Sequence, residues 1–360
     1  SFELLCNKHK KLSGVWIVAY TAVDKSTDYF NTKLYTGTGN SNAQTGVGFS
    51  PSWIWLKNRS SSSNHHAVDA VRGITKEIRP NLSNAQADDN QLITAFGTDG
   101  FTVGTSGSGN TNGDNYASWS WRAGTTSGIS AGSQNITPAS YSINTTAGFG
   151  IYKWSRTGAS TTDFFSHGLG TTPTIAIQKR TDGVQDWYVN YTFVDGSNDN
   201  LHLNKTDAKE DDSTTVPTST NYYPKSPETG DYITYLFRPV RGFSKFSYFT
   251  GNGNVDGPFL HCGFKPAFVI IKNTVDGAKN WEMLDNKRPG HNPADDLLFP
   301  DTVDAESASQ TDRRVDFTST GIKIRGNSAQ MNASGQTMIF MAFAAAPFVN
   351  SSGIPVTAGV

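Results

Sequence analysis

Residues 48–58 read GFSPSWIWLKN. A second copy, GFKPAFVIIKN, covers residues 263–273, and a divergent copy, GTTPTIAIQK, covers residues 170–179. Proline is tolerated at the start of a strand but not in its middle, and it favours extended geometry in the residue before it. The β-branched and aromatic residues that follow favour a strand that is buried on much of both faces. Each stretch therefore predicts one buried strand, and its recurrence predicts an internal repeat.

Single positions of this strand recur in register. In each copy a lysine stands six places after the proline, and two copies have an aromatic residue two places after it. These repeat positions are Pro51, Trp53 and Lys57; Pro173 and Lys179; and Pro266, Phe268 and Lys272. Because the lysine ends the apolar run, we expect it to lie at the surface and to close the strand.

Three other elements recur in order around the proline-led strand. An alternating strand ending in a Thr-Gly turn precedes it, a hairpin pattern with a Gly-containing turn follows in two copies, and an aromatic or apolar strand closes each copy. The opening strands lie at 29–40, 148–158 and 242–253, the hairpins at 96–103 and 317–324, and the closing strands at 116–121, 232–237 and 338–343. We expect at most one helical turn per repeat, near residues 83–88 and 301–307.

This order predicts an all-β protein of three tandem antiparallel β-sandwich repeats with a jelly-roll-like fold. Glycine, serine and threonine dominate the stretch between the first two repeats, which predicts a linker or one extra hairpin around residues 136–143. The predicted organisation is an N-terminal arm at 1–28, repeats at 29–124, 147–241 and 242–347, the linker at 125–146 and a tail at 348–360. One hypothesis for the arm is that it pairs with a neighbouring subunit, because an unmatched strand can extend another sheet.

The composition excludes several classes of partner. The formal net charge is −1, which gives no reason to expect a nucleic-acid or anionic-membrane partner. No stretch approaches the roughly 20 apolar residues of a membrane span. Charged residues make up 17% of the chain, so the polar surface is built largely from serine, threonine, asparagine and glycine. The two cysteines, Cys6 and Cys262, are far apart, and we do not expect the fold to depend on disulfides.

An Asp-x-x-Arg pattern is the main candidate for a repeated site. It occurs as Asp69 with Arg72 and as Asp285 with Arg288, each 18–19 places beyond its proline. The middle repeat has Tyr188 and Tyr191 in this region and lacks both charges. We interpret the pair as a salt bridge or loop clamp rather than a ligand site.

The remaining polar patterns do not form a catalytic or metal-binding constellation. His65 and His66 are adjacent, and on a strand they face opposite ways. The loop 195–200 resembles part of a calcium loop but lacks its downstream glutamate, so we interpret it as a polar turn. We therefore expect no enzymatic activity, no metal and no cofactor.

The motif order resembles a repeat domain of bacteriophage virion proteins that are often described as tail-fibre-like. The residues that carry the resemblance are 29–37, 48–58, 99–104 and 242–253, and the resemblance extends over about 29–347. It implies a location on the outside of the virion, with other virion proteins as partners. The family has no established catalytic residues that could be carried over to this sequence.

Our functional prediction is a non-enzymatic tail-fibre or appendage subunit that contacts the host surface. It would act as a homo-oligomer, with a trimer favoured, and would bind a host surface glycan or protein through many weak contacts. Two alternatives are a capsid decoration protein and a carbohydrate-binding module of a secreted system.

Overall fold

The computed structural model describes residues 10–12, 15–17, 21–129, 136–158, 162–225 and 228–347. The regular structure of the described residues is antiparallel strand, apart from two four-residue α-helices and one short 3-10 helix, η1 (Ser26–Asp28). No helix in these ranges is long and apolar enough to cross a membrane. The all-β sandwich prediction is confirmed.

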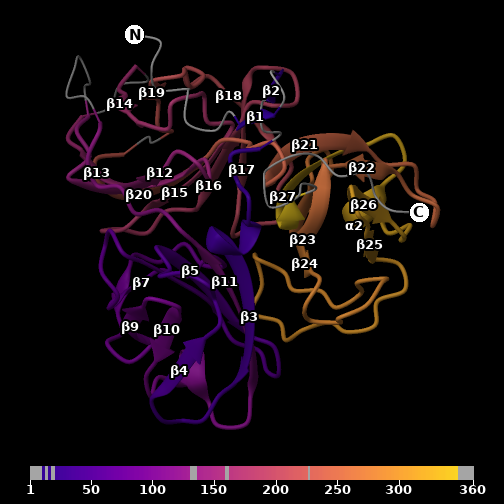
Figure 1. The fold of residues 1–360 in the computed structure, drawn as a ribbon, viewed down its shortest axis with the longest axis horizontal. Coiled ribbons are helices and arrows are strands. Elements are labelled where there is room, and N and C mark those ends of the chain that lie inside the picture. The colour runs from indigo at the N-terminus through magenta and orange to yellow at the C-terminus, as the bar shows by residue number, and fades with distance from the viewer. Residues whose placement is uncertain are drawn as a thin grey trace.

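The strands group into three lobes, which Figure 1 shows around a common centre. Lobe 1 contains β3 (Phe30–Thr36), β4 (Asn42–Thr45), β5 (Trp53–Asn58), β6 (His65–Asp69), β7 (Lys76–Glu77), β8 (Ala87–Asp88), β9 (Ile93–Gly97), β10 (Gly100–Val103), α1 (Gly107–Asn110) and β11 (Asn115–Trp121). Lobe 2 contains β12 (Ser140–Asn144), β13 (Phe149–Arg156), β14 (Phe165–Ser166), β15 (Ile175–Arg180), β16 (Tyr188–Tyr191), β17 (Asn198–His202), β18 (Glu210–Asp212), β19 (Asn221–Tyr222) and β20 (Gly230–Phe237). Lobe 3 contains β21 (Ser244–Thr250), β22 (Phe259–His261), β23 (Phe264–Asn273), β24 (Trp281–Asp285), β25 (Val315–Phe317), β26 (Gly321–Ile324), α2 (Ala329–Asn332) and β27 (Thr337–Pro347).

One strand order occurs in the largest sheet of each lobe. It is β3-β11-β5-β6 in lobe 1 and β21-β27-β23-β24 in lobe 3. In lobe 2 the same order, β13-β20-β15-β16, lies inside a seven-stranded sheet that β12 extends at one edge and β17 and β18 extend at the other. The proline-led strand (β5, β15 or β23) is therefore always paired with the closing strand on one side and with a short following strand on the other.

Alternation along these strands builds two kinds of core. In β5, Trp53 and Trp55 belong to a core that all three lobes share, whereas Ile54 and Leu56 pack against β9 and β10 of their own lobe. The inner sheet and the outer sheet β4-β10-β9 thus form a sandwich. A separate cluster, which includes Trp154 of β13, fills lobe 2.

Aromatic rings join the lobes in pairs at the shared core. The ring centroids of Trp53 and Tyr235, from lobes 1 and 2, lie 4.3 Å apart. Trp121 lies 6.1 Å from Phe268 of lobe 3, and Phe237 of lobe 2 lies 5.9 Å from Phe343 of lobe 3. The three lobes therefore share one core and form a single body rather than three separately packed sandwiches.

Some local predictions were wrong. Residues 83–88 form a loop and the two residues of β8, and residues 301–307 contain no helix. The α-helical turns lie instead at α1 and α2, just before the closing strands. The predicted hairpins are present as β9–β10 and β25–β26. In the segment predicted as a linker or one extra hairpin, β12 pairs with β13 of lobe 2, and residues 130–135 lie outside the described residues.

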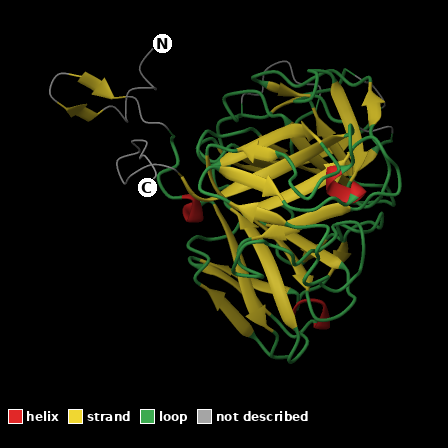
Figure 2. Ribbon diagram, turned by 90° about the vertical axis from the view of Figure 1, so that its right-hand side faces the viewer, coloured by secondary structure: helices red, strands yellow, loops and turns green. Residues whose placement is uncertain are grey.

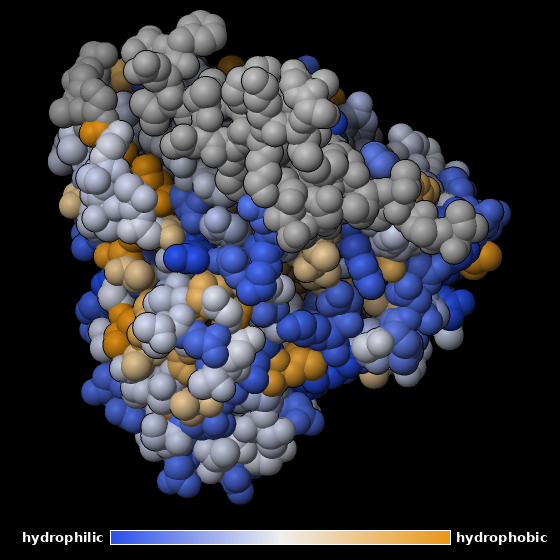
Figure 3. Space-filling view, in the orientation of Figure 1, coloured by the Kyte–Doolittle hydropathy of each residue, from blue (hydrophilic) through white to orange (hydrophobic). Residues whose placement is uncertain are grey.

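Two strands, β1 (Lys10–Leu12) and β2 (Val15–Ile17), form a small antiparallel hairpin that precedes lobe 1. Figure 2 shows this hairpin standing away from the body. The face seen in Figure 3 is mostly hydrophilic, with hydrophobic residues scattered over it. The tail at 348–360 lies outside the described residues.

Candidate functional site

The repeated lysines are buried, which corrects the expectation that they lie at the surface. Lys57, Lys179 and Lys272 all have 0% exposed surface. Burial lowers the pKa of each ammonium group to about 8. The lysine ends the apolar run because it enters a junction between two lobes, where backbone carbonyl groups replace water as its partners.

Each lysine bonds to a loop of a different lobe. Lys57 of lobe 1 donates to the carbonyl oxygen of Val303 in lobe 3, at 3.3 Å. Lys179 of lobe 2 donates to Ser83 O in lobe 1, at 3.1 Å, and Lys272 of lobe 3 donates to Thr206 O in lobe 2, at 3.1 Å. Each also donates to a carbonyl of its own lobe, namely Asn58 O, Arg180 O and Lys279 O. The three bonds run in one direction around the centre and close a ring.

A second ring of bonds lies beside the first, on the neighbouring strand. His65 stands opposite Lys57, and Trp281 stands opposite Lys272. In lobe 2 the corresponding residue is Trp187, which immediately precedes β16. His65 Nε2 lies 2.9 Å from Phe299 O of lobe 3, Trp187 Nε1 donates to Leu82 O of lobe 1 at 3.1 Å, and Trp281 Nε1 donates to His202 O of lobe 2 at 2.9 Å. Three different contacts therefore connect the same pairs of lobes as the lysines do.

The role of His65 as a donor follows from its other ring nitrogen. Trp55 Nε1 donates to His65 Nδ1 at 2.9 Å, so Nδ1 accepts and Nε2 carries the proton. Burial, reinforced by the charge of Lys57, holds the pKa of His65 well below its usual value. His65 is thus a neutral structural histidine. His66 faces the other way, as alternation predicts, and its Nδ1 lies 2.9 Å from Glu77.

The two Asp-x-x-Arg pairs are salt bridges and loop clamps at once, as predicted. Asp69 Oδ2 accepts from Arg72 Nε at 2.6 Å, while its Oδ1 accepts from two backbone N–H groups of the following turn. Asp285 and Arg288 repeat this geometry at 2.7 Å. All four side chains are almost fully buried. A carboxylate held in this way fixes the turn that follows β6 or β24.

Each aspartate also accepts a bond from the closing strand of another lobe. Tyr235 Oη of lobe 2 donates to Asp69 of lobe 1 at 2.7 Å. Trp119 Nε1 of lobe 1 donates to Asp285 of lobe 3 at 3.2 Å. The pair that sequence reasoning took as local therefore also joins the lobes, and its partners could not be seen because they lie in other repeats.

The third junction, between lobes 2 and 3, has no polar clamp of this kind among the described residues. The lobe 2 residue equivalent to Asp69 is Tyr191, which pairs with Ile175 as Asp69 pairs with Trp53. The lobe 3 residue equivalent to the donors Trp119 and Tyr235 is Met341. The methionine side chain has no N–H or O–H to donate. A small apolar cavity of about 20 Å³ lies here, lined by Ile175, Ile177, Val189, Leu203, Ile270, Trp281, Ile339, Phe340 and Met341. At these equivalent positions, the junctions of lobe 1 with lobes 2 and 3 are thus polar, and the junction between lobes 2 and 3 is apolar.

The prolines and aromatic repeat positions serve the same core. Trp53 and Phe268 belong to the shared aromatic cluster, and Pro51, Pro173 and Pro266 are buried. Pro266 is the third residue of β23, and the register with β27 shifts there. A bulge tolerates the missing N–H of proline, which explains its place inside a strand.

A polar hollow of about 380 Å³ lies on the loop of lobe 3 that receives Lys57. It is lined by Asn280, Phe299, Asp304, Ala305, Glu306, Ser307 and Arg313. Glu306 accepts from Arg59 of lobe 1 at 2.6 Å and from Arg288 at 3.0 Å. Nearby, burial raises the pKa of Glu282 to about 8, although Arg313 opposes the shift. The charges here hold this loop against lobe 1.

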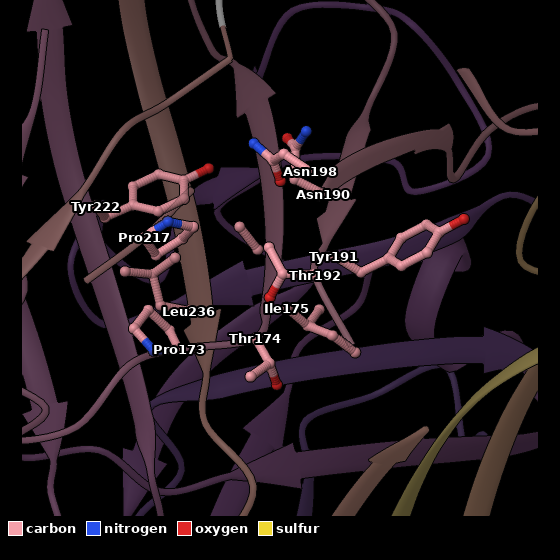
Figure 4. A pocket seen from close by; sticks show the side chains of 11 residues that line it. Pro173, Thr174, Ile175, Asn190, Tyr191, Thr192, Asn198, Pro217, Tyr222 and Leu236 are labelled. Carbon is pink, nitrogen blue, oxygen red and sulfur yellow. The ribbon is translucent and has the colours of Figure 1, made fainter. Parts of the chain in front are cut away.

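Lobe 2 contains a smaller pocket with a mixed polar and apolar lining, shown in Figure 4. Its volume of about 10 Å³ has room for about one water molecule. Tyr222 and Asn190 are among the residues that line it, and Tyr222 Oη and Asn190 Oδ1 have no hydrogen-bond partner among the described residues. The prediction of a polar turn at 195–200 is correct only for its first half. Residues 195–197 form an exposed turn, in which the Asp195 carboxylate accepts from the N–H and hydroxyl of Ser197, whereas residues 198–200 are buried in β17. Within the described ranges, no three His, Cys, Asp or Glu side chains are grouped to hold a metal.

Comparison with known families gives one match. The model of a domain of unknown function, DUF7483, matches residues 25–347. The chain belongs to this family. The match covers all three lobes and leaves β1 and β2 outside it. Neither the curated proteins nor the solved structures gave a match.

Proposed function

We propose that this member of the DUF7483 family is a non-enzymatic structural protein of a bacteriophage virion, exposed on the particle as a tail-fibre or appendage subunit. The proposal of a virion location rests on the order of repeated motifs in the sequence. The observation that carries a structural role is the use of the repeated charges. Lys57, Lys179 and Lys272 all bond across junctions between lobes.

A rigid three-lobed body suits the contact with a host surface that we propose. The shared core and the two rings of bonds fix the lobes, so the loops at their outer ends keep fixed relative positions. Several weak loop contacts on one rigid body act together, and further copies multiply the effect. The ligand that we propose is a glycan or protein of the host surface.

A capsid decoration protein is the second candidate, and one observation favours it. A single chain brings three sheets of the same strand order around one core. Such a body has an approximate threefold shape without oligomerising, which suits a threefold position on an icosahedral shell.

Immunogold electron microscopy tests both candidates. Antibodies raised against the purified chain are applied to particles of the virus that carries this sequence, with antibody pre-absorbed on the chain as control. We expect gold at the tail or its appendages. Gold over the shell would select the decoration role. Particles without label, and without peptides of the chain in mass spectrometry, would overturn the virion proposal.

A further inference from the structure

The edge of the first repeated strand is covered in lobe 2. There β12 pairs antiparallel with β13, from Ser140 opposite Lys153 to Asn144 opposite Phe149. The strand that covers this edge comes from the segment that immediately precedes β13. The same edge is formed by β3 in lobe 1 and by β21 in lobe 3, where β11 and β27 are the only strands of the described chain that pair with them.

Side chains partly occupy the open edge of β3. Lys287 Nζ donates to Thr32 O at 2.7 Å, and Asn42 Nδ2 donates to Thr36 O at 3.1 Å. These two bonds satisfy outward carbonyl groups that a further strand would need. The edge of β3 is therefore poorly suited to receive a strand.

The edge of β21 has outward peptide groups that remain available. Gly251 N donates to Gln336 O and Ala344 N donates to Phe243 O, so odd-numbered residues of β21 bond towards β27. Phe246 and Tyr248 therefore direct their N–H and C=O groups outward. Ser244, which also faces outward, is bonded to Val240, whereas within the described chain no hydrogen bond reaches the outward groups of Phe246 and Tyr248. They correspond to Ile151 and Lys153, which β12 covers in lobe 2.

Exposed apolar side chains lie on this edge strand and on the segment that follows it in the chain. The side chain of Tyr248 is 45% exposed, and the following loop and strand contribute Val255 at 55% and Phe259 at 49%. These are three of the seven large apolar residues that are exposed in the described chain. An open edge strand with exposed apolar side chains is a template for pairing with another chain.

The β1–β2 hairpin is a strand donor that finds no acceptor among the described residues. Its two strands pair only with each other there, and the hairpin stands away from the body (Figure 2). It also precedes β3 in the chain as β12 precedes β13. We propose that the hairpin of one copy adds to the β21 edge of a second copy, as β12 adds to β13 within lobe 2. The proposed contact is a strand addition between identical chains, and this proposal does not depend on a virion location.

Crosslinking between differently labelled copies tests the partner. In a chain with Cys6→Ser and Cys262→Ser, one preparation carries Trp16→Cys and a second carries Tyr248→Cys. We expect a short bis-maleimide to join the two preparations when they are mixed. A crosslink that forms only within a chain carrying both cysteines would show that the hairpin adds to its own body. No crosslink in either sample would also overturn the proposal.

Proline at the edge tests the geometry. Tyr248→Pro removes an outward N–H and leaves the bonds to β27 intact, because the neighbouring residues make them. We expect the wild-type mass in light scattering to exceed the 38.9 kDa of one chain and to rise with concentration. The proline variant should return to one chain, while Tyr248→Ala, which keeps the N–H, should retain part of the association.

A monomeric wild type at every concentration, or a proline variant that associates like wild type, would overturn the proposal. If Tyr248→Pro fails to fold, Tyr248→Lys replaces it, since an edge lysine opposes strand addition without removing a ladder bond. Unchanged association of the lysine variant would count against the β21 edge. Neither result bears on whether the chain is found in virions.

Discussion

The ammonium group of Lys179 in lobe 2 lies 3.1 Å from the carbonyl oxygen of Ser83 in lobe 1, and the lysine is fully buried at the junction of the two lobes. Ser83 precedes Lys179 by 96 residues. Equivalent bonds join Lys57 to Val303 and Lys272 to Thr206. The repeated lysine thus spans a fixed distance between lobes, which explains why it stays six residues from the proline in all three copies.

The buried lysines give the fold a pH dependence of defined sign. The pKa of Lys272 is about 8 in the folded chain and about 10.4 in an unfolded chain. Between these values the unfolded state binds more protons, so the free energy of unfolding rises with pH, by at most about 1.4 kcal/mol per pH unit for one lysine. Below pH 8 the charged lysine is present in both states and its contribution is constant.

The difference in unfolding free energy between wild type and Lys272→Met isolates this effect. In urea titrations at each pH, we expect the stability of wild type relative to Lys272→Met to increase from about pH 8 to about pH 10. The difference should stay constant from about pH 6 to about pH 7.5. Lys25→Met, at a side chain that is 65% exposed, is the control for replacing a surface lysine. A level difference for Lys272→Met over the whole pH range would show that the ammonium group is not desolvated.

The bond from Tyr235 to Asp69 predicts that one hydroxyl stabilises the junction of lobes 1 and 2. Tyr235→Phe removes a donor to a buried carboxylate and leaves the ring in place against Trp53. We expect a loss of about 1.5–3 kcal/mol in unfolding free energy. Tyr248→Phe, at an exposed ring, is the matched control and should change the stability by less than about 0.5 kcal/mol. Equal effects of the two changes would contradict the clamp.

Much of the fold could be predicted because it is encoded locally. The proline-led strands, the Asp-Gly and Thr-Gly hairpins and the closing strands depend on alternation and turn residues within a few positions. The Asp69–Arg72 clamp was predicted for the same reason, since its partners are three residues apart. Elements of this kind need no knowledge of where the repeats lie in space.

The predictions failed where the partner lies in another lobe. Lys57 ends an apolar run and resembles a surface lysine until Val303 O is placed beside it. His65 and Trp187 carry no signal in a single copy, although their place opposite the repeated lysine is a periodic pattern that a three-way alignment of the repeats would reveal. The helical turns were missed because α1, Gly107–Asn110, is rich in glycine, a poor helix former.

The Asp285–Arg288 pair predicts an asymmetry between breaking and replacing a buried ion pair. Asp285→Asn removes one of the two carboxylates that pair with the buried Arg288, leaves Glu306 as the other, and weakens the bond from Trp119. We expect a loss of up to about 3–5 kcal/mol, the range for a broken buried ion pair. Asp285→Asn combined with Arg288→Met should recover part of this loss in guanidinium titrations, because the guanidinium that lost a partner is gone and Glu306 keeps its bond from Arg59. A double variant that is less stable than the single variant would contradict this account.

The Thr-Gly turns predict which repeated glycine is indispensable. A Cβ on Gly37 would lie 2.1 Å from the carbonyl oxygen of Thr111, and one on Gly251 would lie 2.2 Å from that of Ala333. Both oxygens follow the α-helical turns, whose asparagines bind the same loop: Asn110 accepts from Thr38 N and Asn332 accepts from Asn252 N. In lobes 1 and 3 the glycine therefore lies close against the backbone that follows the helical turn, and the asparagine side chain fixes the residue after the glycine.

Lobe 2 supplies the control for this contact. A Cβ on Gly158, in the Thr-Gly turn of lobe 2, would have no described atom within 4 Å, and the φ of this glycine is not positive. We expect Gly37→Ala and Gly251→Ala to lower the thermal midpoint, each costing more than about 1 kcal/mol, since neither backbone segment can move without breaking its bonds. Gly158→Ala should be neutral or stabilise by about 0.4–1 kcal/mol, because alanine restricts the unfolded chain. Equal midpoints for the three variants would show that the turn in lobes 1 and 3 is no tighter than the one in lobe 2.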